Sequence, residues 1–275
     1  MALRVGESMF RSLRELRFEP TAKRIRAMLG GETVVDSMRA VLVWEPTRVV
    51  PVYAVPAEDI TADVVPVGPP LTEAPTAGPA ARGPEDFGAH TTPGRPVLVR
   101  NEAGRHAMGF ILDDPALESY VVLDFAGFDG WLEEDDPITG HPRDPYHRVD
   151  VCHSSRDVRI EAGGSVVAET TSPRLLFETS LPVVRSYLPR EDVRTDLLQP
   201  SETRTICAYK GAATYWSLQV PDGPLERDLV WSYEDPMPEA APIAGLMCFF
   251  DERVDVIVDG KRRERPITFW SPREP

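Results

Sequence analysis

The chain has 275 residues and carries 44 acidic against 30 basic side chains, so its formal net charge is −14 at pH 7. This length is sufficient for two domains that each bury a core of their own. The acidic surplus argues against nucleic acid or an anionic membrane as a partner, because those surfaces attract clustered Lys and Arg.

The cysteines and the apolar segments indicate the cellular compartment in which the protein is found. Cys152, Cys207 and Cys248 are odd in number and widely spaced, which gives neither a disulfide framework nor a CxxC metal signature. No apolar stretch has the length of a membrane span, and none near Met1 has the character of a signal peptide. We therefore expect a cytoplasmic protein without a membrane partner.

The first predicted element is a short helix over residues 7–16, where apolar side chains recur at helical spacing. Short β-strands follow along the rest of the chain, with charged and apolar residues alternating in segments such as 23–29 and 157–162. Pro56 and Pro189 each precede acidic residues and predict a single helical turn. We predict a mainly β protein, made of small antiparallel β-sandwich or partly open barrel units with few short helices.

One sequence pattern occurs twice, over residues 23–65 and again over 156–198. At one constant spacing, a Gly-Gly pair, a glutamate, a proline and two aspartates of the first copy fall on the same residue types in the second. A Gly-Gly pair between two strand patterns is typical of a tight hairpin turn. The matching residues are Gly30-Gly31 and Gly163-Gly164, Glu45 and Glu178, Pro56 and Pro189, Asp59 and Asp192, and Asp63 and Asp196.

This duplication predicts two domains, a first unit over 1–151 and a second unit over 152–275. The boundary rests on the sequence Arg-Val-Asp-Val, which occurs at 148–151 and at 253–256 and which we interpret as the end of each copy. Because the connection is short, we expect the two units to pack as an intramolecular pseudo-dimer with approximate two-fold symmetry.

Residues 66–96 interrupt the first copy. The segment is rich in Pro, Gly and Ala and almost without aromatic residues, whereas the second copy crosses the same point with residues 199–202 alone. Such a composition buries too little apolar surface to offset the entropy of ordering. We predict an extended or mobile insertion.

The second copy contains the sequence CAYKGAATYW at residues 207–216. We expect its counterpart in the first copy near residues 97–111, where the Cys, the Lys-Gly and the Tyr-Trp are missing. Lys210 precedes Gly211, which predicts a hairpin turn with an ammonium group near its tip. A lysine that is partly desolvated among aromatic residues binds carboxylates or phosphates, or acts as a nucleophile or base. The alternative is a surface lysine that lies over aromatic core residues. The candidate ligand-binding residues are Glu178, Tyr187, Cys207, Lys210, Tyr215, Trp216 and Trp231.

Glu178 follows an apolar run, and Glu45 takes the same place in the first copy. A glutamate in such a run is costly to bury without a partner. It acts either as a general acid–base with a raised pKa or as a structural carboxylate paired with a cation or with backbone amides. Its recurrence in a copy that lacks the Cys and Lys-Gly favours the structural alternative.

His141, Asp144 and His147 are three residues apart and consist of metal-ligating residue types. Pro142 and Pro145 break any helix there, so this spacing places the three side chains on no common face. A proline-restricted turn between the units is the preferred interpretation. We predict no metal site and no cofactor.

Several segments of the second copy resemble one known family. They read GGSVVAET from residue 163, RLLFET from 174, YLPREDV from 187, DLLQPSETRTICAYKGAATYWSL from 196 and VWSYEDPMPEAAPIAG from 230. Together they resemble the domain-of-unknown-function 427 family, in the tandem form common in actinobacteria, over roughly residues 18–260. The resemblance implies a small all-β domain in a cytoplasmic protein without an established reaction. The nucleotidyltransferase label sometimes given to that family finds no Gly-Ser with paired aspartates and no glycine-rich phosphate loop here.

No local motif identifies a reaction. The leading hypothesis is binding of a small molecule, with or without catalysis, in a pocket of the second unit lined by aromatic residues and Lys210. A non-enzymatic protein-interaction module built from duplicated β-domains is the first alternative, and a metal-dependent enzyme is the second. A pocket that holds Lys210 and Glu178 within hydrogen-bond reach would favour the leading hypothesis, whereas a flat surface with an exposed sheet edge would favour an interaction module.

Overall fold

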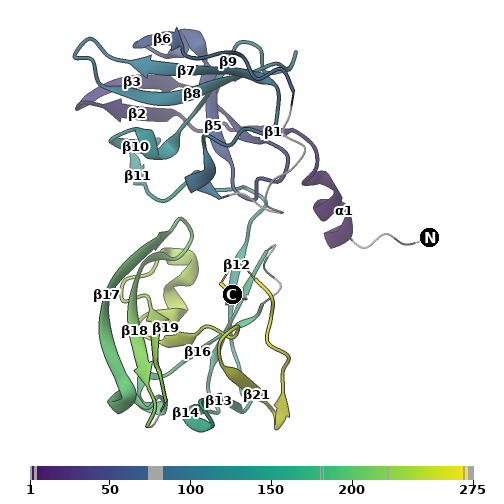
Figure 1. Cartoon of the computed structure of the whole chain (residues 1–275), viewed down its shortest axis with the longest axis vertical. Helices are drawn as coiled ribbons and strands as arrows, with labels where there is room; N and C mark the ends of the chain where they lie inside the picture. Colours follow the sequence, from purple (N-terminus) through teal and green to yellow (C-terminus); the bar gives the residue numbers. More distant parts are fainter. Residues whose placement is uncertain are drawn as a thin grey trace. The chain divides into compact units, whose positions relative to one another are not determined.

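Figure 1 shows the computed structural model of the chain, which describes residues 2, 5–73, 83–179, 181, 183–221, 223–268, 270 and 271. The chain divides into two compact units, Met1–Asp144 and Pro145–Pro275. Each unit is a sandwich of one seven-stranded and one four-stranded sheet, so the predicted mainly β fold class is confirmed. No helix in the described ranges is long and apolar enough to cross a membrane.

The first unit begins with the helix α1 (Val5–Ser12), which ends earlier than the predicted residue 16. Its larger sheet has the order β1 (Arg17–Pro20), β4 (Val41–Trp44), β5 (Val52–Pro56), β9 (Tyr120–Leu123), β8 (His106–Leu112), β7 (Gly94–Arg100) and β6 (Asp63–Pro66). Its smaller sheet has the order β11 (Asp136–Ile138), β10 (Gly130–Glu133), β2 (Ile25–Leu29) and β3 (Glu32–Ser37). Short 3-10 helices lie between these strands, namely η1 (Ala57–Asp59), η2 (Pro84–Asp86) and η3 (Phe125–Gly127).

The second unit repeats this arrangement. Its larger sheet has the order β12 (Val149–His153), β15 (Arg174–Glu178), β16 (Arg185–Leu188), β20 (Met247–Phe249), β19 (Leu225–Ser232), β18 (Gly211–Gln219) and β17 (Leu198–Cys207). Its smaller sheet has the order β14 (Ser165–Thr170), β13 (Val158–Ala162), β21 (Asp255–Val258) and β22 (Lys261–Arg262). Its 3-10 helices are η4 (Arg190–Asp192), η5 (Thr195–Leu197) and η6 (Pro238–Ile243).

The two Gly-Gly pairs form equivalent hairpin turns, as predicted. Gly30 and Gly31 join β2 to β3 with φ angles of 67° and 82°, and Gly163 and Gly164 join β13 to β14 with 56° and 79°. A two-residue hairpin with both φ angles positive is a turn that glycine adopts without steric cost. Both hairpins also carry a register shift at the equivalent point, after Ala27 in one and after Ile160 in the other. The predicted helical turns after Pro56 and Pro189 are confirmed as η1 and η4.

Each seven-stranded sheet is covered on both faces, which gives each unit two apolar layers. The layer between the sheets includes Ile25, Val99 and Trp131 in the first unit, and a corresponding cluster fills the second. The outer layer of the second unit lies under η6, whose Ala240 and Ile243 are buried against it. Because the sheet is covered on both faces, every residue of β4 and β5 is buried. Strands of this kind have a continuous apolar sequence instead of an alternating one.

The unit boundary lies a few residues before the expected position after residue 151. Residues 149–153 form β12, which pairs with β15 along its whole length and so belongs to the second unit. The second Arg-Val-Asp-Val, at 253–256, leads instead into β21 of the smaller sheet. The two occurrences therefore hold different places in the fold, and the interpretation of this sequence as the end of each copy is wrong.

The insertion predicted over 66–96 contains strand or buried residues on both of its flanks, and residues 74–82 lie outside the described residues. Pro66 ends β6, and Leu71 and Gly94 exchange two backbone hydrogen bonds. Phe87 is buried in the outer apolar layer of the first unit. The segment connecting β8 to β9 covers only 113–119, whereas 233–246 connects β19 to β20 and contains η6. In the first unit, the residues around Phe87 therefore provide cover that η6 provides in the second.

This packing predicts a large stability cost for Phe87→Ala. The substitution removes a buried ring and leaves a cavity, so we expect the free energy of unfolding to fall by about 3 kcal/mol. Glu85→Ala, at an exposed position in the same segment, serves as the control and should change it by less than about 0.5 kcal/mol. Urea unfolding of the full chain, with hydrogen exchange to assign the loss to the first unit, measures both. Equal effects of the two substitutions would contradict the structural role of this segment.

Candidate functional site

The structure brings Glu178 and Lys210 together in the second unit. Glu178 is the last residue of β15, and Lys210 lies in the turn that joins β17 to β18. The Lys210 ammonium donates to both carboxylate oxygens of Glu178, over 2.7 Å to Oε1 and 2.6 Å to Oε2. His147, just before β12, places Nε2 3.1 Å from Oε1 of the same carboxylate. We call these three residues the Glu178 cluster.

The turn itself holds Lys210 in place. Cys207 pairs with Gly211 to close the hairpin, as predicted from the Lys-Gly sequence. Gly211 has a φ angle of +97°, which residues other than glycine rarely adopt. The backbone carbonyl of Lys210 accepts a hydrogen bond from the N–H of Met237, over 3.1 Å. Lys210 is thereby buried beside Glu178 and is not a surface lysine lying over the core.

The electrostatics of the Glu178 cluster favour an ionised glutamate. Burial alone would raise the pKa of Glu178, but the hydrogen bonds and charges of His147 and Lys210 outweigh it and lower that pKa below its ordinary value. A hydrogen bond from Nε2 to an ionised carboxylate requires that His147 carry a proton on that nitrogen. These contacts favour a paired carboxylate over a general acid with a raised pKa for Glu178.

Four of the other candidate residues share the outer apolar layer of the second unit: Tyr187, Cys207, Tyr215 and Trp231. The indole N–H of Trp231 donates to the Tyr187 hydroxyl over 3.1 Å, and both side chains are buried. Burial raises the pKa of Tyr187 well above its usual range. Tyr215 is partly exposed, and its hydroxyl is 2.8 Å from that of Thr205. Tyr187 and Trp231 thus support this face from beneath, while Cys207 and Tyr215 lie closer to solvent.

Trp216 does not join this group. Neighbouring residues of a strand point to opposite faces, so Trp216 lies on the other side of β18 from Tyr215. There it packs against the core between the two sheets, with the guanidinium of Arg190 5.2 Å from its ring centre. The structure therefore does not bring Trp216 together with the other candidate ligand-binding residues.

Two of the three residues considered for a metal contact other groups. His141 Nδ1 lies 2.7 Å from the carbonyl oxygen of Pro142, and His147 contacts Glu178. Across the described ranges, no group of three or more His, Cys, Asp or Glu side chains has a geometry suited to a metal ion. Three free cysteines are present, at 152, 207 and 248.

The first unit holds an equivalent buried carboxylate at Glu45, directly after β4. Glu45 accepts a hydrogen bond of 2.7 Å from the backbone N–H of Thr91, and Nδ1 of His90 lies 2.8 Å away. Arg48 forms an ion pair with it at 3.6 Å and also donates to the carbonyl oxygens of Asp86 and Phe87. These groups lower the pKa of Glu45 against the opposing effect of burial.

Strand register identifies the true counterpart of Lys210. Val97 of β7 pairs with Gly109 as Trp216 of β18 pairs with Val230. Counting back along both strands puts Thr91 at the place of Lys210, and so the expected counterpart at 97–111 is wrong. Sequence reasoning missed His90 and Thr91, because both lie in the insertion that interrupts the repeat, and it did not assign Arg48 to Glu45 or His147 to Glu178. Only the matching Glu45 and Glu178 signalled that two equivalent polar clusters exist.

The two clusters differ in access to solvent. In the second unit the side chains of His147, Lys210 and Glu178 are 16%, 11% and 8% exposed. In the first unit, Glu45 and Arg48 are each 1% exposed, and His90 is 9% exposed. The carboxylate of the first unit is thus closed off by its own chain, whereas solvent reaches the cluster of the second.

The chain matches a known family model. The model NTP_transf_9, described as a domain of unknown function (DUF427), matches residues 17–81 and 150–260. The two matched segments fall in the two units. No curated protein matches the chain.

The pairing of Glu178 with Lys210 predicts strong energetic coupling. Glu178→Gln leaves a buried ammonium without its counter-ion, and Lys210→Met leaves a buried carboxylate with His147 as its remaining side-chain partner. We expect each substitution to lower the free energy of unfolding by about 3 kcal/mol, and the double variant to lose clearly less than the sum. Chemical unfolding of the four proteins measures the cycle. Asp196→Asn, which breaks an exposed pair with Arg194, is the control and should have little effect. Additive losses would show that the pair is not an interacting unit.

Proposed function

The chain belongs to the DUF427 family, and we propose that its second unit binds a small molecule at the Glu178 cluster. The proposed ligand carries a carboxylate, phosphate or other acceptor oxygen that approaches Lys210. The observation that carries this proposal is a largely buried ammonium group held by Glu178 in a place that solvent still reaches. The following features of the cluster support it.

The hydrogen-bonding capacity of Lys210 exceeds what Glu178 uses. An ammonium group has three N–H donors, and Glu178 accepts two of them. The third is available to an acceptor oxygen of a ligand. Because Glu178 fixes the position of the ammonium before any ligand arrives, little further ordering of the lysine side chain is needed on binding.

Aromatic side chains stand beside the cluster. The ring centres of Tyr209 and His147 lie 4.2 Å apart. Tyr215 and Cys207 belong to the outer apolar layer of the same unit. An apolar surface with a few fixed polar groups is the usual composition of a small-molecule site. The ligand that best suits this composition combines a flat apolar part with one oxygen-bearing group.

The same features favour binding over proton transfer by Glu178. Its lowered pKa keeps it ionised near neutral pH, so it orients Lys210 instead of donating a proton. The short name of the family model refers to nucleotidyl transfer, and nucleotides fall within the class of ligands with phosphate oxygens. They are therefore one group to test among others.

A protein-interaction module is the second candidate function, and the edge strand β17 is the observation that favours it. This strand has ten residues and lies at the end of its sheet, with Ile206 exposed. An open edge of this kind pairs readily with a strand of another protein. However, a register shift between Pro200 and Arg204 interrupts the strand, which is a common device against such pairing.

The proposed function predicts that binding depends on Lys210. A thermal-shift screen of the full chain with carboxylic acids, inorganic phosphate and nucleotides identifies a ligand, and calorimetry then compares variants at a temperature where all are folded. We expect Lys210→Met to weaken binding about tenfold to a hundredfold, since a hydrogen bond to a charged group contributes about 1.5–3 kcal/mol.

Lys261→Met is the matched control, because Lys261 is an exposed lysine of the same unit. It should leave the affinity unchanged. Equal affinity of the wild type and Lys210→Met, or an equal loss in both variants, would contradict the proposed site. A screen without any stabilising compound would do so as well.

A further inference from the structure

A second feature of the second unit lies around Arg185, whose side chain is buried. Its guanidinium donates to both oxygens of Glu252, over 2.8 Å and 2.7 Å, and to one oxygen of Asp251 over 3.0 Å. Thr268 also donates to Glu252. One buried cation therefore faces two carboxylates, and Glu252 receives three hydrogen bonds where Asp251 receives one from Arg185.

Asp251 is consequently the less compensated of the two acids. Burial raises its pKa above the ordinary value, even though Arg185 acts in the opposite direction. A buried carboxylate in this condition is stabilised by any further positive charge that reaches it. The local balance of charge thus favours a cation.

A small pocket gives access to Asp251. Its volume is about 100 Å³, and it lies between the segment before β16 and the chain that follows β22. Four valines form its apolar walls, Asp251 is a buried part of its lining, and Glu264 is exposed at its rim. The valines are Val183, Val184, Val254 and Val256.

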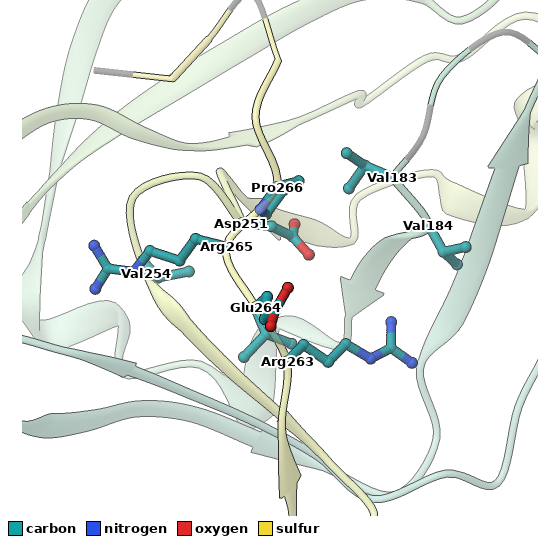
Figure 2. A pocket seen from close by; sticks show the side chains of 9 residues that line it. Val183, Val184, Asp251, Val254, Arg263, Glu264, Arg265 and Pro266 are labelled. Carbon is teal, nitrogen blue, oxygen red and sulfur yellow. The ribbon is translucent and has the colours of Figure 1, made fainter. Parts of the chain in front are cut away.

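The charged side chains around the pocket are arranged asymmetrically. Figure 2 shows the side chains of Arg263 and Arg265 extending in opposite directions, away from the carboxylates of Asp251 and Glu264. Arg265 is bound by Asp255, with its Nε 3.2 Å and its Nη2 3.1 Å from Oδ1. The polar groups that remain directed at the pocket are therefore acidic.

We propose that this pocket binds a small primary ammonium ion with a short apolar chain. The ammonium group would lie between Asp251 and Glu264, and the valines would contact the chain. Apolar walls disfavour a hydrated metal ion, which needs polar ligands on most sides. A cavity of about 150 Å³ in another protein holds benzene, so a volume of about 100 Å³ suits an ion of about four or five non-hydrogen atoms.

The proposal is tested with n-propylammonium chloride added to the full chain and followed by amide chemical shifts. We expect saturable shifts confined to residues 183–184, 251–256 and 263–266, with a dissociation constant on the order of 1 mM. n-Propanol has the same size without the charge, and sodium chloride supplies charge without the apolar chain. Neither should produce the saturable shifts.

Two variants assign the binding to the carboxylates. Asp251→Asn retains an oxygen that can accept from Arg185 and should weaken binding at least tenfold. Glu264→Gln, at an exposed position, should weaken it several-fold with the fold intact, and it decides the question if Asp251→Asn unfolds. Glu202→Gln, an exposed acid on β17, is the control and should have no effect. The proposal is overturned if no saturable shifts appear, if propanol or sodium gives the same shifts, or if Glu264→Gln binds as tightly as the control.

Discussion

An ionised glutamate buried at the end of one strand is the constraint on which each unit of this protein depends. Taking a carboxylate out of water costs several kcal/mol unless charged or N–H partners meet it. Glu45 and Glu178 hold the same place in the two units, and each has hydrogen-bond partners in segments distant in the chain. The positions of the turn at Lys210, of His147 and of the segment around His90 all follow from this requirement.

The two units satisfy the requirement with different chemistry. In the first unit the backbone N–H of Thr91 takes the place that the Lys210 ammonium takes in the second. Arg48, in the connection between β4 and β5 that also holds Glu45, supplies the positive charge. The segment that contains Thr91 also places Phe87 over the outer face of the sheet, where the second unit has η6. A polar pairing and an apolar cover are thus combined in one insertion. This combination leaves the side chain of Glu45 1% exposed, against 8% for Glu178, and this difference supports our proposal of a ligand site in the second unit only.

The repeated pattern was sufficient to predict two similar β units, their Gly-Gly hairpins and the turns after Pro56 and Pro189, because all of these depend on local geometry. It was also sufficient to place Lys210 in a turn and to single out Glu178. The partner of Lys210 in the first unit was not predictable in this way, because a long insertion separates it from the repeat and only strand pairing restores the register. Trp216 is a different case, because alternation along β18 by itself places Trp216 and Tyr215 on opposite faces of the strand. His147 approaches Glu178 through the pairing of β12 with β15, which no local pattern encodes.

The central claim is that both buried glutamates are ionised because their partners hold them so. A pH titration of the side-chain carboxyl carbons by NMR, with Glu45 and Glu178 assigned individually, tests it most directly. The account predicts that both titrate below the ordinary glutamate value of about 4.3. Titration of either residue above that value would show that burial outweighs the partners, and it would contradict the account.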